Sequence, residues 1–243
     1  MNVDGAVTIV TGASGGIGRA IAVALADRNG RVVVVARRAD PLGEVAREIV
    51  DRGGQAAIVT GDVADEATAA AAVEAANSQF GDVRILVNAA GFGPPKPLLE
   101  LTKELWDATI ESCLTGLYVM TRAVLPAMLA NGAGRIVNVS SVAGKGAEAN
   151  RTAYCAAKWG VEGFSASLRH ELAGTGVRLH VLNPASVATD WWASSGDPQP
   201  PTVLDRMLAV RDVADALMWI LAQPDRVQID DIGIHNAVNP WNA

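Results

Sequence analysis

Cysteine and histidine are scarce in this sequence. It contains two cysteines, Cys113 and Cys155, and three widely separated histidines, His170, His180 and His235. Two thiols cannot form a disulfide-rich scaffold, and none of these residues stands at the spacing of a zinc site. We therefore expect no metal centre and a reducing, cytoplasmic compartment.

Clustered positive charge is also missing. The formal net charge at pH 7 is −6, and the densest basic cluster is the pair Arg37-Arg38. A nucleic-acid surface needs gathered Lys and Arg side chains that neutralise phosphates. We therefore expect no nucleic-acid partner, and an acidic balance of this kind is typical of a soluble protein.

Long apolar runs are absent too. No uncharged stretch reaches the roughly 18 residues that a membrane-spanning helix needs. The first residues, Met1 to Gly5, carry no basic leader and run directly into an apolar segment. The sequence therefore predicts a protein that has no membrane partner.

Half of the residues are hydrophobic and 19% are charged, so the chain of 243 residues can bury a sizeable core. Short β-branched apolar runs alternate with longer segments rich in Ala, Leu, Glu and Arg. The predicted strands are residues 7–10, 31–36, 55–60, 84–88, 135–139, 177–182 and 229–235; the predicted helices are residues 16–27, 41–52, 65–80, 101–131, 152–173 and 202–222. This alternation predicts one α/β domain over residues 1–243, with a doubly wound parallel sheet of about seven strands and helices on both faces.

Local signals mark some of the element boundaries. Asp65 and Thr152 are candidate N-caps, and Gly53 and Gly81 are candidate helix stops. One stretch, residues 190–201, is irregular and rich in Trp, Ser, Gly and Pro. Because a loop of this size in a compact α/β domain is often a lid, we expect a substrate lid around residues 190–201.

A glycine-rich turn connects the first predicted strand to the first predicted helix. Glycine permits a tight turn and the close approach of a pyrophosphate, which the free N–H groups of a helix N-terminus then bind. Glycines also occur in ordinary loops, but this placement between strand and helix favours a Rossmann-like dinucleotide site. We expect cofactor contacts from Gly12, Ser14, Gly16, Ile17 and Gly18.

The end of the second predicted strand indicates which dinucleotide binds. Ala36 stands where NAD-binding folds often place a carboxylate for the ribose 2′-hydroxyl, and Arg37 follows it. A guanidinium can hold a 2′-phosphate, which favours NADP(H), although NAD(H) and a merely solvated basic turn stay open. Asp62, after the third predicted strand, is placed either to accept from the adenine amino group or to cap the next helix.

Tyr154 and Lys158 lie four residues apart in a predicted helix, so their side chains share one face. An ammonium beside a phenol stabilises the phenolate, which lowers the pKa of the tyrosine from its usual value of about 10. Ser141 ends the fifth predicted strand, where α/β sheets place ligands. Each of these residues alone is more often structural, but their combination predicts chemistry at a carbonyl.

Together these residues resemble the short-chain dehydrogenase/reductase family over essentially the whole chain, in its single-domain form. The resemblance is greatest to the ketoreductase branch that is similar to 3-oxoacyl-carrier-protein reductases. The matching positions are Thr11, Gly12, Gly16 and Gly18 in the cofactor turn, Asp62-Val63 in the adenine pair, Asn88-Ala89-Ala90-Gly91 after the fourth strand, and residues 183–189 with their threonine, Thr189. Ser141, Tyr154 and Lys158 match the catalytic serine, tyrosine and lysine.

The resemblance implies an NADPH-dependent oxidoreductase that interconverts a ketone or aldehyde and an alcohol, assembled as a homotetramer or homodimer. Tyr154 would act as general acid, Ser141 would donate to the carbonyl oxygen, and Lys158 would lower the pKa of the tyrosine and bind the nicotinamide ribose. Further cofactor contacts implied by the family are Val63, Asn88, Gly91, Pro184, Val187 and Thr189.

The same resemblance implies an apolar pocket for a small carbonyl or alcohol substrate, because Phe92, Val142, Trp191 and Trp192 would converge above the nicotinamide. The two tryptophans could instead pack between subunits. Cys113 departs from the family, which usually has an Asn there that helps hold a water between the lysine and solvent. A thiol is a weak donor and a weak acceptor, so a catalytically silent NADP(H)-binding sensor or scaffold stays open, as does an NAD-linked alcohol dehydrogenase.

Overall fold

The computed structural model describes residues 3–241, so residues 1–2 and 242–243 of the predicted domain lie outside the described part. Seven parallel strands form one sheet in the order β3-β2-β1-β4-β5-β6-β7. The strands are β1 (Val7–Thr11), β2 (Arg31–Ala36), β3 (Gln55–Thr60), β4 (Ile85–Asn88), β5 (Gly134–Val139), β6 (Val177–Pro184) and β7 (Asp231–Ile234). The order reverses between β1 and β4, and the predicted doubly wound sheet is confirmed.

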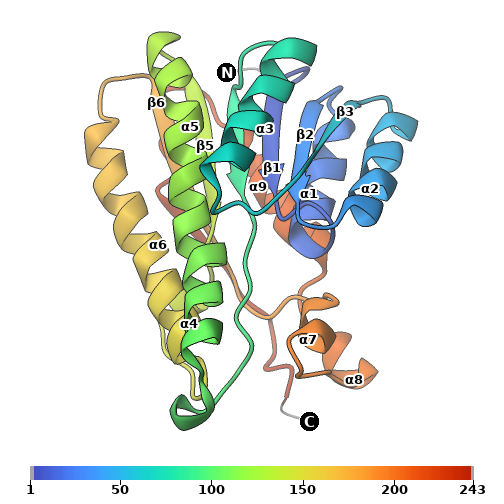
Figure 1. Ribbon diagram of the computed structural model, residues 1–243, viewed down its shortest axis with the longest axis vertical. Coiled ribbons are helices and arrows are strands. Elements are labelled where there is room, and N and C mark those ends of the chain that lie inside the picture. The colour runs from blue at the N-terminus through green and yellow to red at the C-terminus, as the bar shows by residue number, and fades with distance from the viewer. Residues whose placement is uncertain (1–2, 242–243) are drawn as a thin grey trace.

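Helices cover both faces of this sheet (Figure 1). One face packs against α1 (Gly16–Ala26), α2 (Ala39–Asp51) and α9 (Val210–Leu221), and the other against α3 (Glu66–Gln79), α5 (Gly116–Ala130) and α6 (Thr152–Glu171). Successive strand side chains point to opposite faces, so β2 supplies Val32 and Val34 to one core and Val33 and Val35 to the other. Burial on both faces is the reason that this strand is an unbroken valine run.

The structure divides two of the predicted helices. Residues 101–131 form α4 (Lys103–Ile110), a π-helical turn (Glu111–Thr115) and α5. Residues 202–222 contain α8 (Pro201–Leu204) and a separate α9, which starts again because Asp212 accepts a hydrogen bond from the Ala209 N–H at 2.8 Å. The expected irregular stretch 190–201 holds a short helix, α7 (Trp191–Ser194).

The predicted boundary residues have mixed outcomes. Asp65 is the N-cap of α3, and Gly53 and Gly81 follow the ends of α2 and α3 with φ of +89° and +103°. The expectation for Thr152 was wrong, because Thr152 is the first helical residue of α6 and Arg151 is its N-cap. The side chain of Arg151 is instead held inside a cavity described below.

The helical stretch Lys103–Ala130 is long and apolar enough to cross a membrane, judged by length and composition alone, because an 18-residue window within it has a mean hydropathy of 1.4. The sequence criterion, which considered only uncharged stretches, did not identify it. In the described structure this stretch packs through α5 against β4 and β5 and through α4 against α6. A helix from the core of a soluble protein passes the same test, so the finding is weak evidence for a membrane.

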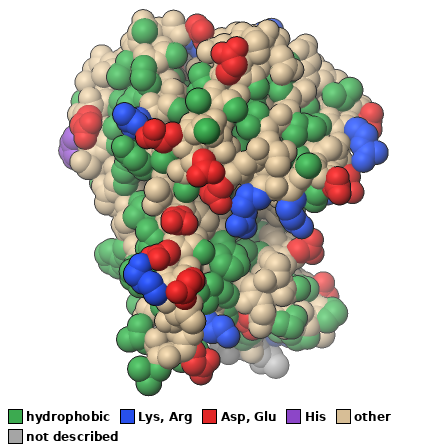
Figure 2. Space-filling model, in the orientation of Figure 1, with side chains coloured by type: hydrophobic (Ala, Val, Ile, Leu, Met, Phe, Trp, Pro, Cys, Tyr) green, Lys and Arg blue, Asp and Glu red, His purple; other side chains and the backbone are tan. Residues whose placement is uncertain are grey.

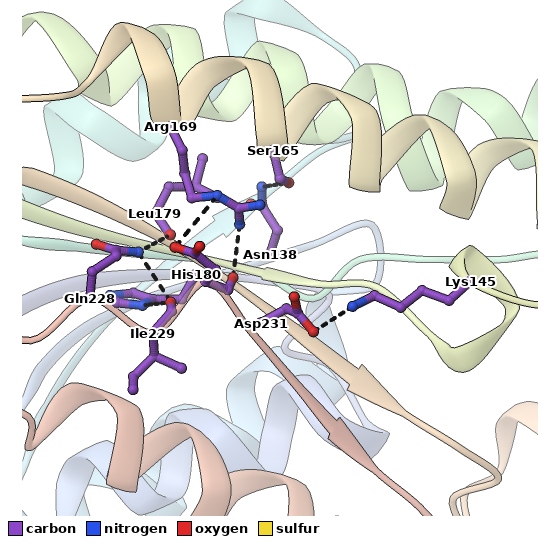
Figure 3. A network of polar contacts seen from close by, with 10 residues as sticks. Asn138, Lys145, Ser165, Arg169, Leu179, His180, Gln228, Ile229 and Asp231 are labelled. Atoms are coloured by element: carbon purple, nitrogen blue, oxygen red, sulfur yellow. Dashed lines mark hydrogen bonds and ion pairs between the residues drawn. The ribbon is translucent and has the colours of Figure 1, made fainter.

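A polar network fastens the last strand to its neighbours (Figure 3). The His180 Nδ1 lies 2.6 Å from the carbonyl oxygen of Ile229, and because a carbonyl can only accept, this nitrogen carries the proton. Gln228 donates to the same carbonyl at 3.1 Å, and Lys145 forms an ion pair with Asp231 at the start of β7. These contacts fix the short, exposed β7 where hydrophobic burial is small.

Candidate active site

A cavity of about 820 Å³ lies at the carboxyl ends of the strands, beside the reversal of strand order between β1 and β4. Open α/β sheets bind ligands at this place. Figure 2 shows the molecule hollowed between its main body and the small lobe that carries α7 and α8, with Lys and Arg side chains at the upper rim. The predicted site residues in the cavity wall are Gly12, Ser14, Gly16, Ile17, Gly18, Arg37, Asp62, Val63, Gly91, Phe92, Ser141, Val142, Tyr154, Lys158, Pro184, Val187, Thr189, Trp191 and Trp192.

The glycine-rich turn is interlocked with the end of β4. Gly12 has φ of +65°, and a Cβ there would lie 2.7 Å from the Ala90 Cα, so no other residue fits. The Thr11 hydroxyl oxygen accepts from the N–H groups of Ala89 and Ala90 at 3.1 and 3.2 Å. The glycine-rich turn, which would hold a phosphate, is therefore fixed against the end of β4. The chain continues from that end toward the substrate side of the cavity.

The N-terminus of α1 points its unpaired donors at this cavity. The first N–H groups of a helix have no acceptor within the helix, and the N-cap, Gly15, has no side chain to cover them. Gly16, Ile17 and Gly18 all line the cavity. These residues fit a pyrophosphate, because oriented N–H groups and the positive end of the helix favour an anion.

The two arginines after β2 lie at one end of the same cavity. Arg37 and Arg38 are exposed, and neither side chain forms a hydrogen bond or ion pair with another described residue. Ala36 supplies no carboxylate in front of them. Asp62 lines the cavity too, and its Oδ1 accepts from the Ala64 N–H at 3.0 Å. This bond closes a local turn before α3 and does not cap that helix, whose N-cap is Asp65.

The tyrosine, lysine and serine converge at the other end. The Lys158 side chain is buried, its Nζ lies 5.6 Å from the Tyr154 ring centre, and it donates to the Val139 carbonyl at 2.9 Å. Ser141 lies close enough to Tyr154 for its hydroxyl to lower the pKa of the phenol. The Ser141 Oγ also accepts from the Ala143 N–H at 3.1 Å, which fixes it at the start of a short 3-10 turn (Val142–Gly144).

The pKa of Tyr154 shifts in the opposite direction to the one expected from the sequence. Burial raises it above the usual value of 10, and this effect exceeds the lowering by Lys158, by the Ser141 hydroxyl and by Arg151. A phenol in an apolar, enclosed place resists ionisation, and the sequence reveals the neighbouring cation but not this burial. The phenol is therefore protonated at neutral pH, as a proton donor must be.

Cys113 contacts backbone rather than open cavity. It is buried in the π-helical turn, where its Sγ accepts from the Phe92 N–H at 3.4 Å and donates to the Phe92 carbonyl at 3.2 Å. A Cβ on Gly91 would meet this sulfur at 3.5 Å and the Lys158 Nζ at 3.7 Å. The thiol thus holds the segment that carries Phe92 beside the buried lysine.

Two tryptophans form the opposite wall on the substrate side. The ring centres of Trp191 and Tyr154 are 6.2 Å apart, and those of Trp191 and Trp192 are 5.1 Å apart in an edge-on arrangement. The Trp192 Nε1 donates to the Val187 carbonyl at 2.8 Å, and the side chain is buried within its own chain. The alternative of packing between subunits is therefore not needed to bury Trp192.

Sequence reasoning missed some cavity residues and included one that lies elsewhere. Arg151, Glu148 and Trp241 line the cavity but were not expected. Arg151 had a signal, because it precedes Tyr154 by three residues and so lies near the same helix face; Trp241 had none. Asn88 is buried behind the cavity wall, where its amide donates to Thr121 and Asn138.

Comparisons with known proteins show which family the chain is similar to. The family model described as short chain dehydrogenase matches residues 6–200. The chain is 40% identical over 233 residues to the D-threitol dehydrogenase of Mycolicibacterium smegmatis, covering 93% of this chain and 89% of that one. It is 34% identical over 240 residues to a 3-oxoacyl-(acyl-carrier-protein) reductase of Vibrio harveyi, covering 97% of each.

A solved structure agrees as well. A metagenomic short-chain oxidoreductase in complex with NADP superposes with a TM-score of 0.83 at 34% identity, covering 98% of this chain and 100% of that one. The chain belongs to the short chain dehydrogenase family, and the predicted resemblance is confirmed. It is an oxidoreductase of that family.

Proposed function

We propose that this protein is an NADPH-dependent oxidoreductase that interconverts a ketone or aldehyde and the corresponding alcohol. The observation that carries the proposal is the convergence of Ser141, Tyr154 and Lys158 on one cavity, whose other end is formed by the glycine-rich turn and Arg37. The family membership supports an oxidoreductase that acts on CH–OH groups with NAD(P).

The cofactor is NADP(H) in preference to NAD(H). A relative of 34% identity was solved in complex with NADP, and Arg37 with Ala36 before it suits a 2′-phosphate rather than a free hydroxyl. Gly16, Ile17 and Gly18 would hold the pyrophosphate, Asp62 and Val63 the adenine, and Thr189, with Pro184 and Val187, the nicotinamide end. When bound, the cofactor supplies a hydride to the carbonyl carbon.

The side chains of this protein provide the proton and its control. Tyr154 donates its phenol proton to the oxygen of the reduced carbonyl, and its raised pKa keeps that proton in place until the oxygen becomes basic. Ser141 donates a hydrogen bond to the same oxygen. Lys158 then stabilises the phenolate, because its buried ammonium lies next to the ring.

The surroundings of this site support further parts of the proposal. Residues 190–201 act as a lid in one domain, with Trp191 closing over the substrate beside Phe92 and Val142. The substrate is a small carbonyl or alcohol compound. We also propose a cytoplasmic enzyme that works as a homotetramer or homodimer, on the strength of the resemblance to its family.

The test is NADPH consumption by the purified protein against a broad panel of ketones and aldehydes, with NADH in parallel. We expect turnover with at least one carbonyl class and a preference for NADPH. Tight NADPH binding without turnover of any carbonyl would contradict an enzyme and favour the silent sensor. Turnover with NADH alone would contradict the cofactor assignment.

A further inference from the structure

Arg151 is a cation of the cavity that the proposed chemistry does not use. It is the N-cap of α6, three residues before Tyr154, and only 11% of its side chain is exposed. Its charge acts on Tyr154, whose pKa it lowers slightly against the larger effect of burial. A nearly buried guanidinium beside the reacting groups needs an explanation, because burying an arginine without partners is costly.

The guanidinium has one acceptor and two aromatic neighbours. Its Nε lies 2.9 Å from a carboxylate oxygen of Glu148, and its Cζ lies 5.2 Å from the Trp191 ring centre and 5.4 Å from that of Trp192. Within residues 3–241, no side chain or carbonyl accepts a hydrogen bond from Nη1 or Nη2. The edge formed by these two nitrogens matches the two oxygens of a carboxylate.

We propose that the substrate is a carbonyl compound that also carries a carboxylate, which binds the Nη1–Nη2 edge of Arg151 while the carbonyl oxygen meets Tyr154. This inference rests on the proposed function and names its substrate class. Arg151 and Tyr154 both lie against the ring of Trp191, which places the guanidinium and the phenol on the same wall of the cavity. A small oxo acid would bridge the two groups, with its apolar middle on the tryptophan.

Glu148 provides a second test of the proposal, because its carboxylate would repel the carboxylate of the substrate. Its side chain is 51% exposed and satisfies only the Nε side of Arg151. Replacing it by glutamine keeps an acceptor for Nε but removes a negative charge from the carboxylate's surroundings. Glu148→Gln should therefore tighten binding of an oxo acid, whereas Arg151→Gln should weaken it.

The first experiment compares linear oxo acids with their methyl esters, using NADPH and the intact protein. Arg151→Gln should raise the KM of the acids by roughly tenfold or more, because a charge-assisted contact is lost, and leave the KM of the esters nearly unchanged. Arg151→Lys should fall between, and Glu148→Gln should lower the KM of the acids only. Arg122→Gln, at an exposed ion pair with Glu66, is the matched control and should change nothing.

If Arg151→Gln changed the KM of acids and esters equally, the proposal would be overturned. A guanidinium that only supports the tryptophans would affect the binding of every substrate equally. If Arg151→Gln does not fold, the opposite sign expected for Glu148→Gln decides the matter, and a KM for acids that stays the same or rises would overturn the carboxylate site.

A second experiment measures binding without turnover, by calorimetry of benzoate and benzamide with the NADP⁺ complex. We expect benzoate to bind more tightly than benzamide, and this difference to vanish in Arg151→Gln. Benzoate binding that depends on Arg151, in a protein that reduces no carbonyl, would sink the proposed function and leave the carboxylate site standing. Active reduction of neutral ketones, with no advantage of benzoate over benzamide, would sink the carboxylate site alone.

Discussion

A cation is buried near each end of the parallel strands, and the two cations differ in how many hydrogen-bond acceptors surround them. At the carboxyl edge, Lys158 donates to one described acceptor, the Val139 carbonyl, and lines an open cavity. Toward the amino edge, Arg135 is 1% exposed and reaches three acceptors, among them Asp225 at 2.9 Å and the His180 Nε2 at 3.4 Å. Buried polar groups are normally satisfied inside the protein. The unused donors at the carboxyl ends of the strands therefore indicate that a ligand binds there.

The two cations mark two kinds of residue. Substitutions at the carboxyl ends of the strands should alter turnover or ligand binding with little effect on stability. Substitutions around Arg135 and His180 should alter stability with little effect on turnover.

The largest effect is expected for Tyr154→Phe. The ring still packs against Trp191, but the proton donor is lost, so turnover should fall by roughly 10² or more. Fluorescence titration with NADPH should give an affinity close to that of the unchanged protein, and the melting temperature should hold. Turnover close to that of the unchanged protein would refute the general-acid role.

The next effect concerns stability and pH at the other edge. Burial lowers the pKa of His180 to about 4, whereas an unfolded histidine titrates near 6.5. The unfolded chain therefore takes up the proton first, and the free energy of unfolding should fall as the pH drops from about 6.5 to 4, by up to about 3 kcal/mol. Urea unfolding near pH 7 and near pH 4.5 measures this loss.

His180→Gln removes the titrating group and should lessen that loss. His170→Gln, at an exposed position of α6, is the matched control and should keep the full pH dependence. An identical dependence in all three proteins would mean that other groups govern the acid stability. Turnover at neutral pH should be nearly unchanged in both variants.

A smaller effect is expected for Arg37→Ala. Losing a charge-assisted contact with a 2′-phosphate should raise the KM for NADPH about tenfold or more and leave that for NADH nearly unchanged. Initial rates at varied cofactor concentration measure both constants. Equal losses for the two cofactors would refute a role in selecting the phosphate.

The smallest effect is expected at Cys113. Its thiol holds both polar groups of the Phe92 backbone, and an asparagine amide can do the same, so Cys113→Asn should keep or raise turnover. Cys113→Leu should lower turnover a few-fold and change the solvent deuterium isotope effect, if proton supply passes this point. A leucine variant that matches the unchanged protein in both quantities would make Cys113 an ordinary core residue.

Much of the fold follows from local patterns in the sequence. The valine run of β2 and the glycine-rich turn before α1 have strong signals, because burial on both faces and positive φ each restrict the residue types allowed. The π-helical turn at Glu111–Thr115 has no such signal, since its residues are ordinary helix formers. The break before α9 depends on one side chain, that of Asp212, and is equally invisible to periodicity.

The candidate site divides in the same way. The spacing of Tyr154 and Lys158 predicts their shared helix face, but the direction of the tyrosine pKa shift depends on how much chain covers the ring. Arg151 stands near that face as well, but its role depends on contacts with Trp191 and Trp192, which belong to α7 and lie some forty residues later in the chain. Contacts between distant segments are what a single sequence does not reveal.

The exposed arginines after β2 carry an evolutionary consequence. The side chains of Arg37 and Arg38 form no hydrogen bond or ion pair with another described residue, so we expect the fold to tolerate their replacement. A lineage could therefore exchange one coenzyme for the other by drift at these two positions, without first acquiring compensating changes elsewhere. Gly12, which leaves no room for a Cβ against Ala90, has no such freedom. If Arg37 selects the coenzyme, as proposed, we expect coenzyme choice to be a changeable trait in this chain, whereas the glycine-rich turn is fixed by the fold.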